Sequence, residues 1–326
     1  MKQVLFGLII CAFVFFSGCE KTVDKFSTVA PDAFLVLDFN EGEALRYRFV
    51  SERTIQTDWN PAEEKSDTRK ISTESVDMVL RYEPVEVDPY GISKIRVYCE
   101  SVRAVTSGQS RKDAVETIAG KSFVITVSPD GKIHDKSQLI EVAQQAGKAA
   151  FRRDSNIKEP DLVEDFTATQ WFLWDSLSSI EKPAAGLKIG QAWKSNLSVP
   201  TSMVLRPVRD VTYRLSQIKQ DDKGRIAVID SEYAFTRETP DDWPALPWSG
   251  RFQLAGQFGF FLSVFQGLHV NSLEGQGKEF FNIDSGRVES YEQEYKFTLK
   301  PGAVPLAGTD PLITVNQRIT MQLLEN

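Results

Sequence analysis

Hydrophobic and polar residues alternate with a period of two along most of the chain after residue 33. In the first such segment, Leu45, Tyr47 and Phe49 alternate with Arg46 and Arg48. Because successive side chains of a strand point to opposite faces of a sheet, this period predicts strands with one face in a core. The other segments with this pattern are 76–82, 95–105, 123–127, 211–215, 226–235, 280–283, 295–299 and 313–323.

A helical period occurs between these two groups of predicted strands. Leu139, Val142, Ala143 and Ala146 recur at three or four positions and predict a helix with a narrow face of small residues. A second predicted helix covers 162–177, where large apolar residues fall at helical spacing. The pattern therefore predicts a mainly β protein with a helical pair, in the α+β class.

The two groups of strands resemble each other in sequence. At an offset of 133 residues, Asp88 aligns with Asp221 and Gly91 with Gly224, each pair in a turn between two predicted strands. With so few identities, chance similarity is one interpretation. The other interpretation is an internal duplication, which predicts two curved antiparallel β-sheets with the helices packed between or against them.

These patterns divide the chain into consecutive segments. We expect a signal peptide at 1–18, a lipidated cysteine with its tether at 19–32, a first β-rich half at 33–135, a helical connector at 136–185 and a second β-rich half at 186–326. The second half contains an additional aromatic segment near 238–272.

The N-terminal segment has the pattern of an export signal. Lys2 precedes an apolar run, Val4–Phe16, which is too short to cross a hydrocarbon core that needs about 20 residues. Ser17 and Gly18 then precede Cys19, and this end resembles the bacterial lipobox, in which the cysteine becomes lipidated and acylated, for example with palmitate. The alternative is that Cys19 is a small residue near an ordinary cleavage site.

The lipobox resemblance implies a bacterial cell-envelope protein that is held at a membrane by its lipid anchor. Two or three acyl chains make such membrane binding effectively permanent. The residue after Cys19 is Glu20, whereas aspartate at this position is the usual signal for retention in the inner membrane. The resemblance therefore favours the outer membrane, with the protein facing the periplasm or the cell surface.

The segment near 238–272 is the most aromatic part of the predicted mature chain. One interpretation is a pair of buried strands, and the other is an apolar surface that contacts a hydrophobic ligand or another envelope protein. The candidate ligand or partner residues are Trp243, Trp248, Phe252, Phe258, Phe260, Phe261 and Phe265.

Composition excludes several kinds of chemistry. The chain has 38 Lys+Arg against 45 Asp+Glu, a net charge of −7, so a nucleic-acid partner is disfavoured. With two His and three Cys, the sequence contains no zinc-type spacing, no catalytic triad motif and no cofactor motif, so we expect no metal, cofactor or catalytic residue. Cys99 lies in a predicted strand and is expected to be buried and inert, while His134 follows a turn and is expected to face solvent.

Two further segments resemble a group of bacterial lipoproteins and secreted proteins built from two β-rich halves, a group to which no function is attached. They are the segment 186–193, which ends in Trp193, and the hairpin that joins Gly277-Lys278-Glu279-Phe280 to Gly286-Arg287-Val288. In this group the first segment typically reads Val-Gly-Asp-x-Trp, and here Gln191 replaces the aspartate.

These observations favour a non-enzymatic, lipid-anchored envelope protein that binds a hydrophobic small molecule or lipid. One alternative is a scaffold that docks another envelope protein through its sheet edges. The other is a hydrolase that uses a pair of carboxylates, which requires two acids in a cleft and a raised pKa for at least one of them.

Overall fold

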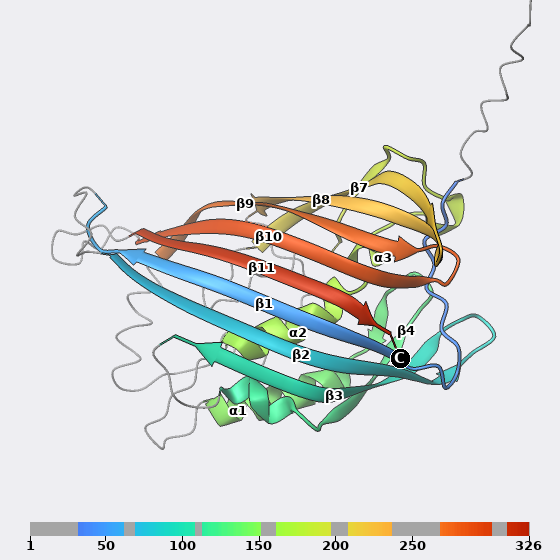
Figure 1. Cartoon of the computed structure of the whole chain (residues 1–326), viewed down its shortest axis with the longest axis horizontal. Helices are drawn as coiled ribbons and strands as arrows, with labels where there is room; N and C mark the ends of the chain where they lie inside the picture. Colours follow the sequence, from blue (N-terminus) through green and yellow to red (C-terminus); the bar gives the residue numbers. More distant parts are fainter. Residues whose placement is uncertain are drawn as a thin grey trace, which may run out of the picture. The chain divides into compact units, whose positions relative to one another are not determined.

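The computed structural model describes residues 32–61, 69–107, 113–150, 161–196, 208–236, 268–301 and 312–325, and its strands all belong to one antiparallel sheet (Figure 1). The strands are β1 (Leu45–Asp58), β2 (Arg69–Val87), β3 (Ser93–Thr106), β4 (Ser122–Val127), β5 (Ile133–Asp135), β6 (Ala192–Lys194), β7 (Val208–Asp221), β8 (Gly224–Thr236), β9 (Leu268–Asn282), β10 (Arg287–Pro301) and β11 (Leu312–Leu324). Each predicted strand segment overlaps one of them, and 280–283 extends one residue beyond the end of β9.

The order of strands across the sheet is β5-β4-β3-β2-β1-β11-β10-β9-β8-β7-β6. The pairing that joins the two halves is between β1 and β11, and its register runs from Arg46–Leu324 to Asp58–Leu312. The expectation of two sheets is therefore corrected. The described strands form one sheet of 11 strands, because the last strand of the second half pairs along the full length of the first strand of the first half.

The sheet buries one face and exposes the other. In β1, Leu45, Tyr47 and Phe49 are buried, whereas Arg48 forms an ion pair with Asp77 of β2 on the exposed face at 2.6 Å. This alternation is the hydrophobic-in, polar-out pattern of an antiparallel sheet with one solvated face. The period of two in the sequence is thus explained, and the buried face is called the inner face below.

The described residues contain three α-helices and two 3₁₀ helices. They are η2 (Ala114–Ile118) between β3 and β4, and α1 (Ser137–Ala150), α2 (Asp161–Phe172), α3 (Asp175–Ser178) and η3 (Pro183–Ala185) between β5 and β6. Figure 1 shows α1 and α2 together on one side of β1, β2 and β3. Leu139, Ala143 and Ala146 of α1 are fully buried, which confirms the predicted face of small residues. The predicted second helix is divided into α2 and α3.

The two ends of the sheet differ in their connections. At one end, short turns join β2 to β3, β4 to β5, β7 to β8 and β9 to β10. At the other end, β1–β2, β6–β7, β8–β9 and β10–β11 are joined by longer stretches that include 62–68, 197–207, 237–267 and 302–311. We call these the turn end and the loop end. Variable loops on a rigid scaffold are the usual place for binding functions.

A short extended segment, Ala33–Asn40, crosses the turn end, and we call it the strap. Ala33 pairs with Leu187, the Leu37 amide donates to the Pro129 carbonyl at 2.7 Å, and the Asp38 amide donates to the Gly286 carbonyl at 3.0 Å. Gly286 has a φ of +60°, and a Cβ there would stand 2.6 Å from Asp38. Only glycine allows this close approach, so the strap is fixed to the hairpins of both halves.

Candidate functional site

Polar side chains form a row across the middle of the inner face, where an apolar core would be expected. The strand pairing places Arg53 beside Glu74 and Gln317, Tyr295 beside Gln317 and Gly275, and Tyr233 beside Gly275. The side chains of Arg53, Glu74, Gln317, Tyr295 and Tyr233 are all buried. We call this set the polar row.

The row holds α2 against the sheet through Asp165. The Arg53 guanidinium donates two hydrogen bonds to Glu74 Oε2, at 2.7 and 3.0 Å, and lies 3.8 Å from Asp165. Asp165 also accepts hydrogen bonds from Ser51 Oγ at 3.3 Å and Gln317 Nε2 at 3.4 Å. The buried guanidinium lies between two carboxylates and pairs with both. An unpaired charge at this position would raise the free energy of the folded state.

A second buried cluster holds α3 against the other half of the sheet. Asp175 accepts hydrogen bonds from Tyr213 at 2.6 Å, Ser195 at 2.7 Å and Ser179 at 3.1 Å. Ser176, the next residue of α3, donates to Glu279 of β9 at 2.8 Å. α2 is therefore bonded to β1 and β11, where the two halves meet, and α3 is bonded to β7 and β9 of the second half.

The Glu279 carboxyl in this cluster has a raised pKa. Burial, together with the charge of Asp175, raises it to about 8, and the hydrogen bond from Ser176 opposes the shift. A carboxyl with a raised pKa near a second carboxylate is the pattern that a hydrolase requires. Here Asp175 of α3 is completely buried and Glu279 is 7% exposed, so a glycan or ester cannot reach the pair.

A groove of about 680 Å³ lies on the exposed face of the sheet, across β1, β11, β10 and β9. Its lining includes Glu52, Glu274 and Glu294, together with Lys296 and Arg318. Arg318 forms an ion pair with Glu294 at 3.5 Å within the groove. The groove is shallow and mixed in charge, so it shows neither the apolar walls of a lipid site nor a concentrated charge for an ionic ligand.

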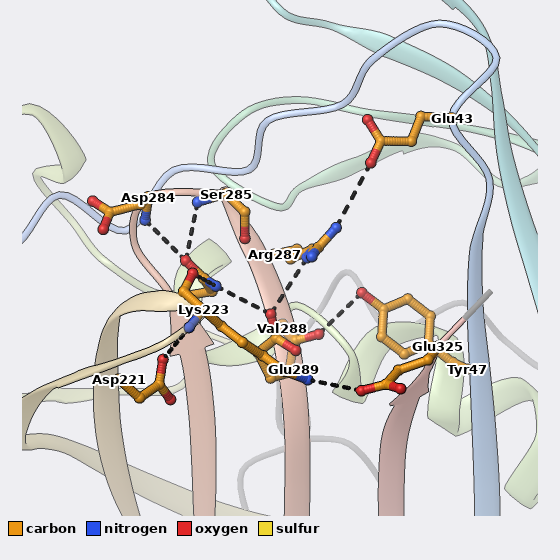
Figure 2. Close-up of polar contacts among 11 residues, drawn as sticks. Glu43, Tyr47, Asp221, Lys223, Asp284, Ser285, Arg287, Val288, Glu289 and Glu325 are labelled. Atoms are coloured by element: carbon orange, nitrogen blue, oxygen red, sulfur yellow. Dashed lines mark hydrogen bonds and ion pairs between the residues drawn. The ribbon is translucent and has the colours of Figure 1, made fainter.

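A smaller pocket of about 340 Å³ lies at the turn end, where Arg287 bridges Glu43 and Glu289 (Figure 2). Figure 2 also shows Lys223 with Glu325, an ion pair of 3.6 Å. The charges around this pocket are thus paired with one another, while leucines such as Leu45 contribute apolar surface to its lining. Partly exposed pairs of this kind stabilise a fold only slightly.

The inner face becomes apolar between the polar row and the loop end. The strand pairing places Val315 beside both Ile55 and Phe297, and Phe297 beside Leu273. Phe297 and Val315 are fully buried and Leu273 is 6% exposed. We call these four residues, with the buried Leu299, the apolar zone. The hydrogen bonds described above join α2 and α3 to strand residues in the polar row or nearer the turn end.

The sequence-predicted site residues lie outside the described residues. They are Cys19 and the seven aromatic residues Trp243, Trp248, Phe252, Phe258, Phe260, Phe261 and Phe265. The structure does describe the attachment points of the aromatic segment: β8 ends at Thr236 and β9 begins at Leu268. Both points are at the loop end, and β9 carries Leu273 of the apolar zone.

Two predictions about single residues are confirmed. Cys99 is fully buried, and burial raises the pKa of its thiol to about 12, so it is inert at neutral pH. His134 is exposed on β5. Trp193, at the end of the segment 186–193, donates its indole N–H to the Ser176 carbonyl at 2.8 Å and so supports α3.

The sequence analysis missed the buried charges, although the period of two contained a signal for one of them. Arg53 occupies the same face as Leu45, Tyr47, Phe49 and Ser51, so it is a charged residue in a row of inward positions. Asp165 and Asp175 carry no comparable signal, because helix α2 is buried on nearly every side and has no polar face for comparison.

Within the described ranges, no group of three or more His, Cys, Asp or Glu side chains could hold a metal ion. Among the helices that the structure describes, none is long and apolar enough to cross a membrane.

Comparison with known proteins gives no family for this chain. No family model matches it, and no curated protein matches it. Among solved structures, lipovitellin, described for its lipid–protein interactions, is similar with a TM-score of 0.45 and 8% identity, over 88% of this chain but 26% of lipovitellin. The chain thus spans about a quarter of the length of that protein.

Two further solved structures have a TM-score of 0.20 to this chain. DynF from the dynemicin biosynthesis pathway of Micromonospora chersina is 7% identical over 91% of this chain and 88% of DynF. OccAB4 of Acinetobacter baumannii is 9% identical over 87% of this chain and 99% of OccAB4. Similarities this low carry no argument about function, which must therefore come from the chain's own residues.

The substitution Arg53→Met tests the role of the polar row. It leaves the buried carboxylates of Glu74 and Asp165 without their shared cation, so we expect the free energy of unfolding to fall by about 3–5 kcal/mol in urea titrations. The matched control is Arg48→Met on the same strand, which removes an exposed pair and should cost less than about 1 kcal/mol. Equal losses in the two variants would contradict a structural role for the row.

The substitution Glu279→Gln tests the protonation of the second cluster. In the wild type, the unfolded state ionises above about pH 4.5 while the folded state keeps its proton to about pH 8, so stability falls across this window. The free energy of unfolding of the wild type should fall by about 1 kcal/mol per pH unit across this window, and Glu279→Gln should remove that fall. Near pH 4.5 the variant and the wild type should have the same free energy of unfolding. Glu274→Gln, exposed on the same strand, is the control; unchanged pH dependence in Glu279→Gln would rule the assignment out.

Proposed function

We propose that this protein is a lipid-anchored envelope protein that binds an apolar ligand, such as an acyl chain, at the loop end of its sheet. The observation that carries the proposal is the apolar zone. It lies on the inner face beside the strand ends from which the aromatic segment 238–272 leaves and to which it returns. An apolar ligand requires a predominantly apolar surface with few polar groups around it.

The polar row supports this location over the rest of the inner face. Between the row and the turn end, aromatic rings already fill the space between helices and sheet: Trp174 contacts Tyr82 and Phe39, and Phe166 contacts Phe123, each edge to face. Such close packing leaves no room for a ligand. The loop-end side of the row is the part of the inner face that remains a candidate. The strands that flank the aromatic residues proposed from the sequence end and begin there, at Thr236 and Leu268.

The lipid anchor is the second part of the proposal. Its support is the lipobox-like sequence that ends at Cys19, together with Glu20, which favours the outer membrane. The following residues, 20–32, have a mixed polar composition without periodicity and would serve as a tether to the strap. The protein would then bind its ligand while remaining attached to the membrane surface.

Internal duplication is supported by the order of the strands. Read across the sheet, β5-β4-β3-β2-β1 is followed by β11 and then by β10-β9-β8-β7-β6, so the same order recurs once with β11 between the copies. The aligned turns also match, because Gly91 and Gly224 both have positive φ and each follows β2 or β7. A duplicated half of five strands within one sheet accounts for both observations.

The two rival functions lack comparable support in the described residues. A scaffold that docks through sheet edges needs a long open edge, but the edge strands β5 and β6 are only three residues each. A carboxylate hydrolase needs its substrate to reach its acids, and Asp175 of α3 and Glu279 of β9 are both buried where α3 packs on the sheet.

Binding of a fluorescent fatty acid to the purified protein tests the ligand. We expect saturable uptake by the wild type and an increase in Kd of about tenfold or more when Phe260 and Phe261 are both changed to serine, because each ring loses apolar contact area. Phe34→Ser, at the turn end, is the control and should leave Kd unchanged. Absence of uptake by the wild type would refute the ligand-binding proposal.

The anchor is tested by Cys19→Ala. Without the thioether-linked lipid, we expect the protein to leave the membrane fraction and to be recovered in the soluble fraction after a high-salt wash, as followed by immunoblotting. The unmodified chain should remain with the membranes under the same wash. If Cys19→Ala still sediments with membranes, the cysteine is not the anchor.

A further inference from the structure

Exposed apolar side chains gather at the turn end, around the strap. Along the strap, Ala33, Leu35, Leu37 and Phe39 are buried, while the alternate residues Phe34 and Val36 are 49% and 39% exposed. A segment that only sealed the end of the core would be expected to present polar residues to solvent. Here both of its first outward positions are apolar.

Three further exposed apolar residues lie at the turn end, on segments that the strap contacts directly or through Pro129. Ile189, 49% exposed, follows Leu187, the pairing partner of Ala33. Tyr90 and Ile92, 84% and 36% exposed, lie in the β2–β3 turn. That turn lies close to Pro129, since a Cβ on Gly91 would stand 2.8 Å from the Pro129 ring, and the Pro129 carbonyl accepts the hydrogen bond of Leu37.

We name Phe34, Val36, Tyr90, Ile92 and Ile189 the turn-end surface. Lys182 and Lys188, on the segment that carries Ile189, are also exposed. Aromatic and aliphatic side chains with nearby lysines are typical of protein surfaces that lie in a membrane interface, where the rings enter the headgroup region and the ammonium groups meet anionic lipids.

The length of the tether indicates what covers this surface. Thirteen residues, 20–32, separate Cys19 from Ala33, which corresponds to a root-mean-square distance of about 20 Å for a flexible chain and at most about 50 Å when fully extended. A lipid on Cys19 therefore holds the strap close to the bilayer at a high effective concentration.

Another exposed apolar group lies at the loop end and does not satisfy this condition. It consists of Trp59, Ile71 and Val105, which are 51%, 63% and 53% exposed. β1 has 14 residues between the turn end and Trp59, and at about 3.3 Å per residue this adds roughly 45 Å to the distance from the tether. The tether thus favours contact of the turn-end surface with the membrane.

We propose that the turn-end surface docks on the bilayer interface that holds the lipid anchor, so that the sheet stands with its loop end away from the membrane. This inference rests on the lipidation of Cys19 in the proposed function. It adds a defined orientation: the loop end of the sheet, with the strand ends at Thr236 and Leu268 and the apolar zone next to them, lies on the side away from the protein's own membrane.

The experiment uses the full mature chain with its lipid anchor, in vesicles of phosphatidylethanolamine and phosphatidylglycerol. Single cysteines at Val36→Cys, Tyr90→Cys and Ile71→Cys receive an environment-sensitive fluorophore, and nitroxide-labelled lipids act as the quencher. Cys99 is buried with a raised pKa and Cys19 carries the lipid, so the unsubstituted chain gives the labelling background. Flotation of each sample reports the anchor separately.

We expect fluorophores at positions 36 and 90 to lose most of their emission to the quencher, while the fluorophore at position 71 keeps most of its emission. Changing Phe34 and Ile189 together to serine should reduce quenching at position 90, and Val105→Ser, at the loop end, should not. A protein that floats with the vesicles but is quenched only at position 71, or at none of the three, overturns the orientation and leaves the anchor intact.

Two remaining outcomes are also decisive. A chain that does not float with the vesicles overturns the anchor of the proposed function and the orientation that depends on it. Quenching at positions 36 and 90 that disappears when a purified envelope protein is added would show that the surface binds protein in preference to lipid, which also overturns the proposal.

Discussion

The pairing of β1 with β11 is the contact on which the remainder of the structure depends. It connects the first and last strands of the described chain along their whole length, and it turns two groups of strands into one sheet. Because the sheet is continuous, its inner face is shared by both halves. The helices between the halves can then bond to strands of each half. Asp165 of α2 accepts hydrogen bonds from β1 and β11, and Asp175 of α3 accepts one from β7.

Buried charge is the structural cost of this arrangement and also its source of specificity. An apolar inner face would let α2 slide along the strands, whereas the carboxylates of Asp165 and Asp175 each have hydrogen-bond donors at one position on the sheet. Buried polar groups fix a single arrangement because other arrangements leave them without partners. We infer that the polar row and the α3 cluster set the position of the helices, and that the row bounds the apolar zone.

Much of the fold could be predicted from the sequence, because strands with one buried and one solvated face have alternating apolar and polar residues. The inward positions of β1, β2 and β11 were predicted from alternation, and the helices from a period of three and four. The single sheet was not predicted. Its formation depends on the pairing of Leu45–Asp58 with Leu312–Leu324, and no local sequence pattern indicates which of two such distant strands will pair. The seven candidate aromatic residues lie outside the described residues, so their part in the site stays a prediction.

An apolar ligand bound at the loop end can be located by photo-crosslinking with a diazirine fatty acid, followed by peptide mass spectrometry. We expect crosslinks on β9–β11 peptides around Leu273, Phe297 and Val315 and on the segment 238–272. Crosslinks confined to the exposed groove around Glu274 and Arg318, or to the pocket around Arg287, would refute ligand binding at the apolar zone.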